Sequence, residues 1–338
     1  MVIFPKHLKI LKFCTLVGFL ATFCTKLEEP LSPEDFPIDL FKSNFPYEAG
    51  HYNTQSITQD VAVSGTFVYL AEQGIGGLRI IDVTDPSRPQ EVSFYYTATA
   101  ELTVIVADEY AYVAGFLGDI RVFDISDPSS PQKIGDYDCP GVLMDVAISN
   151  GYAYIAAHDT GLRVVDISVP SNPQEVGLCN SLGTASAVYV RGAYAYIAST
   201  LAGLWILDIS VPSNPQKISF YEIPHLGAWD VYVESTYAYI ADGIGGLWIL
   251  DISVPSNPQE IGFYNTLHYI TDIYVVAPYA YTVNGDYGLR IIDVTDASSP
   301  KEVGYYITPD YTHGVAVSGC YAYVADDYGG LRIIRVKP

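Results

Sequence analysis

The sequence predicts an all-β protein, a closed seven-bladed β-propeller built from four-stranded antiparallel blades. Three observations predict it. A phrase of the form Gly-Leu-Arg-Ile-Ile-Asp recurs down the chain, each repeat divides into four short apolar segments, and a spare copy of the fourth segment stands near the N-terminus. A fixed period of this kind indicates one supersecondary unit that buries its apolar face by stacking on copies of itself.

The repeat is clearest at the last position of the phrase. Successive copies stand 42 or 43 residues apart, and this position is occupied in turn by Asp82, Asp124, Asp166, Asp208, Asp251, Asp293 and Arg335. Seven copies at this spacing match the size of a propeller blade, which needs four short strands.

Each repeat contains four predicted strands. In one unit, the segments 230–233, 237–241, 246–252 and 259–264 are rich in Val, Ile, Tyr and Phe, and Gly, Pro, Ser or Asn stands between them. Such runs with turn residues between them are typical of strands and hairpins. The third segment is apolar on both sides, as expected of a sheet that is covered on both faces. Neighbouring blades would provide that cover.

The seventh repeat lacks its fourth strand, and the missing copy stands at the other end of the chain. Residues 46–52 (Pro-Tyr-Glu-Ala-Gly-His-Tyr) match residues 300–306 (Pro-Lys-Glu-Val-Gly-Tyr-Tyr) in their Pro, Glu, Gly and Tyr. An N-terminal strand that completes the last blade would close the ring and remove an exposed strand edge. We therefore predict a propeller domain over residues 44–338.

Residues 1–24 have the layout of a signal peptide. Lys6, Lys9 and Lys12 precede an apolar run over residues 13–23, and the first acidic residue is Glu28. A basic start followed by a short apolar run is typical of a secretory leader, and this run is short for a membrane-spanning helix. The protein is therefore expected to be exported, to the cell surface or outer membrane, the periplasm or the extracellular space.

Cys24 raises the alternative of a lipoprotein-type leader, in which this cysteine is the lipidated first residue of the mature chain. Phe23 is bulky at a position where such signals carry a small residue, so ordinary cleavage nearby is the competing interpretation. Residues 25–43 bear Pro and Glu and lie outside the repeats, which predicts a linker or tether.

The formal net charge of −21 limits the partners of the protein. A strongly acidic surface repels nucleic acid and anionic membranes, so no nucleic-acid partner is expected and the membrane is reached only through an N-terminal lipid. The body of the chain has three widely spaced cysteines, Cys139, Cys179 and Cys320. We predict free or buried thiols, with a Cys139–Cys179 bridge as the alternative. A monomer is expected.

Ligand binding is expected on the loop face, which we define as the loops that enter the innermost strands together with the loops between the second and third strands of each blade. These loops are the least repetitive part of the sequence, and variable loops on a rigid scaffold are where binding usually resides. The candidate ligand-binding residues are His225, Trp229, His268, Tyr269, Tyr311, His313, His158, Tyr287, Asp327 and Tyr328. No catalytic residue is predicted.

An enzyme with a metal-assisted hydrolase or lyase site in the central funnel is the alternative, because His225, His268 and His313 lie in three consecutive loops. These positions are not equivalent between repeats, and the sequence has no paired-cysteine, His-x-x-x-His or Gly-x-Ser-x-Gly motif. No cofactor is therefore predicted. Ca²⁺ near Asp286 or Asp326, or a transition metal at the histidines, stays an alternative, although no loop has the ligand spacing of a dedicated calcium site.

An aspartate recurs at the start of the innermost strand, at Asp60, Asp145, Asp230 and Asp272. These residues could form a ring of carboxylates for a ligand. We favour a structural role, in which each carboxylate binds N–H groups of a neighbouring loop or an arginine of the Leu-Arg-Ile strand, because a group that repeats in many blades usually makes the same local bond in each.

The Leu-Arg-Ile-Ile-Asp core, with Tyr-Ala-Tyr-Val-Ala before it and Pro-Gln-Glu-Val-Gly after it, resembles the LVIVD repeat family over residues 44–338. Departures are Arg335 for the final Asp, Trp205 and Trp248 for the Arg, and Thr282 in one second strand. The resemblance implies a β-propeller on cell-surface and exported proteins of bacteria and archaea, and it implies no chemical activity.

Together these observations predict a non-enzymatic binding, adhesion or interaction scaffold that is exported and associated with the cell surface. The expected ligand on the loop face is a protein, a peptide or a glycan, because aromatic side chains supply stacking area and acidic side chains favour cationic or polar groups.

Overall fold

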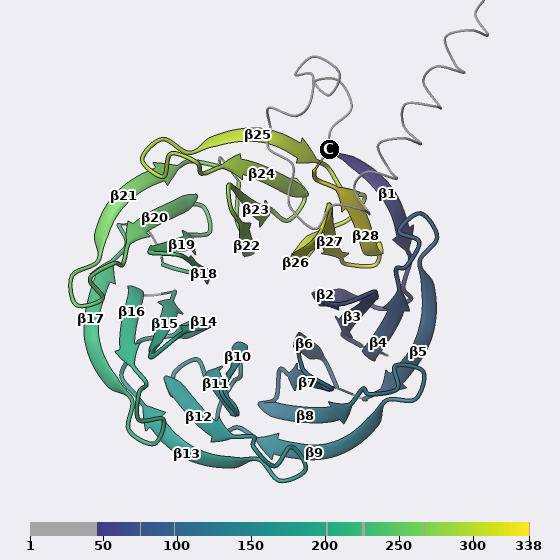
Figure 1. Cartoon of the computed structure of the whole chain (residues 1–338), viewed down its shortest axis with the longest axis horizontal. Coiled ribbons are helices and arrows are strands. Elements are labelled where there is room, and N and C mark those ends of the chain that lie inside the picture. Colours follow the sequence, from purple (N-terminus) through teal and green to yellow (C-terminus); the bar gives the residue numbers. More distant parts are fainter. Residues whose placement is uncertain are drawn as a thin grey trace, which may run out of the picture.

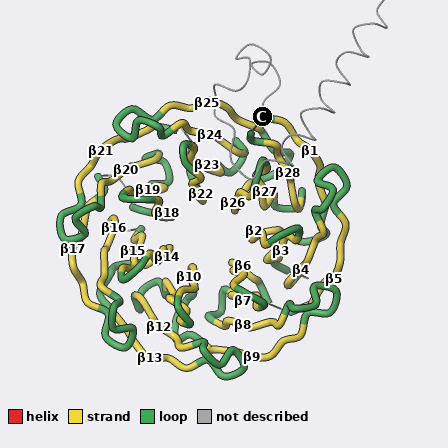
Figure 2. Tube along the Cα trace, in the orientation of Figure 1, coloured by secondary structure: helices red, strands yellow, loops and turns green. Residues whose placement is uncertain are grey.

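The computed structural model describes residues 46–74, 76–97, 99–200, 202–224, 227–266 and 268–337. These residues form 28 strands in seven four-stranded antiparallel sheets, which are arranged as blades around a common axis (Figure 1). Figure 2 shows strands and loops throughout the ring, and the described residues contain no helix with the length and apolarity to cross a membrane. The predicted signal peptide, linker and lipidation at Cys24 lie outside the described residues.

The blades are numbered 1 to 7 from the one that begins at β2. The innermost strands are β2 (Thr58–Ser64), β6 (Glu101–Ala107), β10 (Asp145–Ser149), β14 (Ala185–Arg191), β18 (Asp230–Glu234), β22 (Asp272–Val276) and β26 (Thr312–Ser318). The second strands are β3 (Phe67–Glu72), β7 (Tyr110–Gly115), β11 (Tyr152–Ala156), β15 (Tyr194–Ser199), β19 (Tyr237–Ala241), β23 (Tyr279–Val283) and β27 (Tyr321–Asp326). Each pairs with its innermost strand and with a third strand.

The third strands are β4 (Gly77–Asp82), β8 (Asp119–Asp124), β12 (Leu162–Asp166), β16 (Gly203–Asp208), β20 (Leu247–Asp251), β24 (Leu289–Asp293) and β28 (Gly330–Arg335). The outer strands are β5 (Gln90–Tyr96), β9 (Gln132–Asp138), β13 (Gln174–Cys179), β17 (Gln216–Glu222), β21 (Gln259–Tyr264), β25 (Lys301–Tyr306) and, for blade 7, β1 (Tyr47–Tyr52). The predicted seven-bladed propeller is therefore confirmed.

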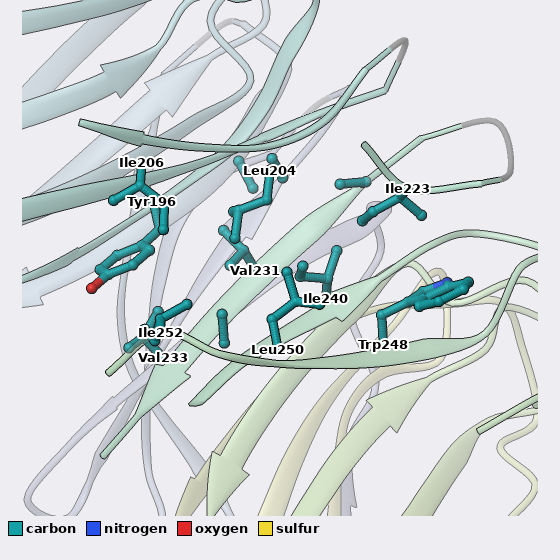
Figure 3. Close-up of a cluster of buried hydrophobic side chains, with 14 residues drawn as sticks. Tyr196, Leu204, Ile206, Ile223, Val231, Val233, Ile240, Trp248, Leu250 and Ile252 are labelled. Atoms are coloured by element: carbon teal, nitrogen blue, oxygen red, sulfur yellow. The ribbon is translucent and has the colours of Figure 1, made fainter. Parts of the chain in front are cut away.

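The hydrophobic core lies between blades rather than within them. Figure 3 shows one interface, where Leu204 and Ile206 of blade 4 face Val231, Ile240 and Leu250 of blade 5. All five side chains are buried. A sheet with apolar residues on both faces packs against a neighbour on each side, which explains why the second and third strands read as continuous apolar runs. Burial at about 25 cal/mol per Å² of apolar surface is the main term that holds such blades together.

The N-terminal strand completes the last blade, as predicted. β1 pairs antiparallel with β28, with Tyr52 opposite Leu331 and Tyr47 opposite Arg335. The Tyr306 hydroxyl on the outer strand of blade 6 donates to Oε2 of Glu48 in β1 at 2.7 Å. The outer edge of β28 is thereby paired, so the ring has no open strand edge at the point where the chain begins and ends.

The Glu-Val-Gly phrase of the outer strands forms a β-bulge that lies against the next blade. The register shifts between Ile291 and Ile292, for example, so that Val303 has no partner on the third strand. In blade 3 a Cβ added at Gly177 would lie 2.2 Å from the carbonyl oxygen of Pro212, which belongs to the turn of blade 4. At Gly177 the absence of a Cβ lets the backbone of one blade touch the proline turn of the next.

The repeated aspartates hold neighbouring blades together. Oδ1 of Asp145 accepts from the backbone N–H of Val146 at 2.7 Å, and Oδ2 accepts from the N–H of Val188 in the next blade at 2.9 Å. Asp60, Asp230 and Asp272 make the same pair of bonds to their own blade and to the following one. The structural role is supported, but the expected partner was wrong, because the bond goes to the next blade's innermost strand and not to a loop or an arginine.

The arginines of the third strands pair with other carboxylates. Nε of Arg79 donates to Glu72 at 2.5 Å, and Nη1 of Arg121 donates to Glu101 at 2.5 Å. Both glutamates are fully buried. A buried guanidinium needs such a partner, since an unpaired buried charge is strongly destabilising. Of the cysteines, Cys139 and Cys179 are free and buried, whereas Cys320 is disulfide-bonded, so the prediction of a free thiol is wrong for Cys320.

Candidate binding surface on the loop face

The loop face has a rigid backbone. At four blade boundaries, a loop residue between the second and third strands accepts a hydrogen bond from the backbone N–H of the next blade, at 3.0–3.1 Å. The acceptor–donor pairs are His158–Ala185, Gly243–Ile270, Gly285–Thr312 and Asp327–Thr58. Each acceptor residue has a left-handed φ between 41° and 56°. Because the bond uses only backbone atoms, the side chain at this position is available for other roles.

Three aromatic side chains at the start of blades 5, 6 and 7 form what we call the aromatic platform: Trp229, Tyr269 and Tyr311. The rings of Trp229 and Tyr269 meet edge to face, with centroids 5.5 Å apart. Trp229 is 38% exposed, and both tyrosines are partly exposed. The platform therefore offers aromatic surface to a ligand from three consecutive blades.

Two loop glycines seat this platform. A Cβ added at Gly243 would lie 3.0 Å from ring atoms of both Trp229 and Tyr269, and a Cβ at Gly285 would lie 2.6 Å from Cε2 of Tyr311. Each glycine belongs to the blade before the tyrosine that rests on it. In the other five blades the same loop position carries Gln73, Phe116, His158, Thr200 and Asp327. Glycine thus occurs where, and only where, a tyrosine enters the following blade at the equivalent position.

The loops of the loop face carry acidic residues and no basic ones. The loops of the loop face contain no lysine or arginine in the sequence, and their aspartates are Asp159, Asp242, Asp286, Asp310 and Asp327. Four of the five belong to blades 5–7. Burial raises the pKa of Tyr311, and the charge of Asp286 adds to the effect. Burial likewise raises the pKa of Tyr269, with contributions from Tyr311 and Asp242. These hydroxyls stay protonated near neutral pH.

His313 lies beside the platform. Its ring centroid is 5.0 Å from that of Tyr311, and its Nε2 lies 3.3 Å from Nε2 of Gln59 and 3.7 Å from Oδ2 of Asp327. Burial lowers the pKa of His313 below its usual value near 6.5, although Asp327 acts in the opposite direction. The imidazole is therefore neutral at pH 7 and adds no positive charge to this face.

Of the remaining predicted residues, some lie next to the platform and His158 lies away from it. His268 stacks on Tyr287 with centroids 3.4 Å apart and the ring planes 9° from parallel, at the edge of blade 6 next to the platform. Tyr328 is 59% exposed on the following blade. His158 lies in blade 3, where its Nδ1 is 3.0 Å from Oδ1 of Asp159, and no contact joins it to the platform among the described residues. His225 falls outside the described residues.

No group of three or more His, Cys, Asp and Glu side chains among the described residues is arranged to hold a metal ion. His268 and His313 each have an aromatic partner of their own, at Tyr287 and Tyr311. The chemistry that these contacts support is stacking and charge complementarity, and the described side chains do not converge as metal ligands do.

The contact of Gly243 and Gly285 with the platform rings was not predicted, although the sequence contains a pattern that indicates it. Gly243 and Gly285 are the second residues of their loops between the second and third strands. In the aligned repeats, glycine at this position occurs together with a tyrosine in the next blade, three residues before the position of the repeated inner-strand aspartate. This pattern is visible only when the loop with the glycine is compared with the loop that carries the tyrosine in the next repeat, because the two loops meet at the blade boundary.

The fold defines a seven-bladed β-propeller that carries non-repetitive loops at one end. The LVIVD repeat model matches residues 56–97, 102–139, 140–181, 182–222, 227–266, 269–308 and 309–336. The chain therefore belongs to the LVIVD repeat family. No curated protein matches its sequence.

Solved structures share the architecture at low sequence identity. The computationally designed protein Ika8 is 10% identical, with a TM-score of 0.64 over 85% of this chain and 98% of its own. A chain of the mitotic checkpoint complex is 13% identical, with a TM-score of 0.69 over 93% of this chain and 98% of its own. At such identities the likeness shows the fold alone.

Proposed function

We propose that the protein is an exported, surface-associated binding scaffold that holds a protein, peptide or glycan on the loop face of its propeller. The observation that carries the proposal is the aromatic platform. Trp229, Tyr269 and Tyr311 offer exposed ring surface, two glycines make room for them, and backbone bonds between blades fix the loops below. Rigid aromatic anchors on a preorganised surface are typical of binding sites, because little conformational entropy is lost when they engage a partner.

Two exposed rings on the outer strands are already covered by cations of the protein itself. On the outer strands, Phe94 and Tyr305 lie beneath Arg79 and Arg290 of their own blades, with guanidinium-to-centroid distances of 4.3 and 4.8 Å. These rings already have a partner, whereas no cation–π contact is made by the platform rings among the described residues. This difference favours the loop face as the place where a ligand binds.

A probe array tests the proposal. Purified propeller is applied to arrays of peptides and of oligosaccharides, in parallel with a variant that carries Trp229→Leu, Tyr269→Leu and Tyr311→Leu. We expect a subset of probes to bind the wild type and to be lost by the variant. The control is Phe116→Leu, which removes a ring that is 50% exposed on the same face but in blade 2. Arrays on which wild type and triple variant give the same pattern would overturn the proposal.

The export part of the proposal rests on the basic and apolar pattern of residues 1–24 and is tested separately. Expression of the full chain in a bacterial host, followed by fractionation and mass spectrometry of the mature N-terminus, should show a product that lacks the leader. A lipid-modified Cys24 at the N-terminus would select the lipoprotein alternative, whereas an uncleaved cytoplasmic product would contradict export.

A further inference from the structure

We propose that the aromatic platform recognises a basic peptide segment, whose arginine and lysine side chains stack on Trp229, Tyr269 and Tyr311. This inference rests on the proposed binding function and specifies its ligand. Aromatic faces attract cations through the ring quadrupole, and the attraction is stronger for arginine, which also stacks as a flat group.

Charge complementarity points to a cationic ligand. The loops of this face carry five aspartates and no lysine or arginine, and four of those aspartates lie in the three blades that carry the platform. His313 is neutral at pH 7 because burial lowers its pKa. A cationic side chain on the platform therefore meets the negative charge of the loop aspartates, and Arg332 at this end of blade 7 is already paired with Asp326 at 2.9 Å. A neutral sugar gains nothing from this field.

The geometry also favours a ligand with several basic groups. The platform residues come from three consecutive blades, and each occupies the start of its blade. A single small cation can stack on one ring, but only an extended segment with several cations can use all three. The net charge of −21 adds long-range attraction for such a segment and speeds its association.

The same chain shows the pairing that we infer. Arg79 lies over Phe94, Arg290 over Tyr305 and Lys217 over Trp205, at 4.3 to 4.8 Å from the ring centroids. In those places the cation is supplied by the protein itself. The loops around the platform contain no lysine or arginine, so these loops do not supply such a cation themselves.

The experiment measures binding of three short capped peptides by calorimetry or fluorescence anisotropy. One has three arginines separated by glycines, the second has citrulline in place of each arginine, and the third has aspartate. A neutral oligosaccharide is the fourth probe. Citrulline keeps the shape and hydrogen-bonding groups of arginine and removes the charge. We expect the arginine peptide to bind at about 0.15 M salt, where long-range screening is strong, and the citrulline peptide to bind at least about tenfold more weakly.

Variants separate the platform from general electrostatic attraction. Trp229→Leu and Tyr311→Leu are each expected to weaken the arginine peptide about two- to tenfold, and Asp286→Asn is expected to weaken it by a smaller factor. Phe116→Leu, on the same face, should leave the affinity unchanged. Thermal melts of each variant verify that the ring is intact. Loss of affinity that is equal in all variants, or affinity that ignores the two platform substitutions, would overturn the inference.

The outcomes also separate this inference from the proposed function. If the citrulline peptide or the oligosaccharide binds as well as the arginine peptide, and Trp229→Leu abolishes that binding, the loop face is a binding site but not one for cations. If none of the four probes binds, the inference is wrong, and the wider probe array then determines whether the proposed function falls with it.

Discussion

Replacing Gly50 with alanine tests whether the N-terminal strand closes the ring. Gly50 lies in β1, and a Cβ added there would lie 2.1 Å from the carbonyl oxygen of Pro86 in the turn of blade 1. Gly177 has the same place in blade 3, 2.2 Å from the carbonyl oxygen of Pro212. Neither glycine has a left-handed φ, so alanine is allowed by the backbone at both positions and only the contact with the next blade opposes it.

The size of the effect follows from two opposing terms. A contact more than 1 Å shorter than ordinary van der Waals separation must be relieved by a shift of the proline turn, and overpacking of this kind costs about 1–3 kcal/mol. Alanine also reduces the conformational entropy of the unfolded chain, which returns about 0.4–1 kcal/mol. We expect each variant to lose about 1–2 kcal/mol in the free energy of unfolding. Urea titrations and calorimetric melts measure the loss.

The comparison of the two variants decides the question. If β1 is docked as the outer strand of blade 7, Gly50→Ala and Gly177→Ala lose similar amounts. If Gly177→Ala is destabilised while Gly50→Ala is unchanged or more stable, the closing strand does not pack on blade 1 and the reasoning is refuted. Gly50→Ser should lose less than Gly50→Ala, because Ser93 and Ser219 occupy this position in blades 1 and 4 and donate their hydroxyls to proline carbonyls at 2.7 and 2.6 Å.

Three further predictions concern the platform, the inner ring and the enzyme alternative. Gly285→Ala should be less stable than Gly65→Ala by about 1 kcal/mol or more, because the two glycines have φ of 56° and 59° but only Gly285 has a ring in contact; equal unfolding midpoints would refute the seating of Tyr311. Burial raises the pKa of Asp145 from 3.8 to about 8, and the charge of Asp230 adds to the effect. The folded state therefore keeps a proton that the unfolded chain releases, so the free energy of unfolding should fall as the pH rises from about 4 to about 8, and Asp145→Asn should flatten that fall in urea titrations; parallel curves for the two proteins would contradict this. Elemental analysis of purified protein should find no stoichiometric transition metal, whereas a metal that is lost when His268 and His313 are replaced would support the enzyme alternative.

The architecture could be predicted from the sequence because every blade repeats the same contacts. The strands, the turns and the closing segment all recur, so a match between residues 46–52 and 300–306 was enough to place β1 on β28. The partners of the repeated arginines could not be predicted in this way. Arg79 lies opposite Leu70 and Phe94 in the third strand, two strands from the innermost aspartates, so its side chain reaches Glu72 and not the inner ring.

The carboxylate that pairs with the third-strand arginine comes from different strand positions in different blades, which makes the pair difficult to recognise from the repeats. The carboxylate that holds Arg79 comes from the end of the second strand, at Glu72. In blade 2 that position is Gly115, and the carboxylate comes from Glu101 in the innermost strand, directly opposite it. The two strands pair at this point, so either can supply the buried charge that the arginine needs. In an alignment of the repeats, Glu72 and Glu101 are differences at two separate positions. In the folded sheets, both glutamates make the same ion pair with the third-strand arginine.

The side-chain contacts of the candidate site could not be predicted from the sequence. The sequence placed Trp229, Tyr269, Tyr311 and His313 among ten candidate ligand-binding residues of the loop face, and it gave no reason to separate them from His158, which lies in blade 3. That separation depends on which side chains touch across a blade boundary. Gly285 and Tyr311 are 26 positions apart in the sequence, and Trp229 and Tyr269 are 40 positions apart, so no local pattern reports such boundary contacts.

The loop face shows how a repeated ring can carry a site without losing its rigidity. The backbone bond between blades is made alike by His158, Gly243, Gly285 and Asp327, so the chain conformation at this position does not depend on the side chain. Glycine is favoured at this position by the left-handed φ, which is strained for the His158 and Asp327 side chains that occupy it in other blades. Gly243 and Gly285 occur at the two boundaries where a tyrosine ring rests on the loop, so at these positions the left-handed φ and the contact with the ring both favour the absence of a Cβ.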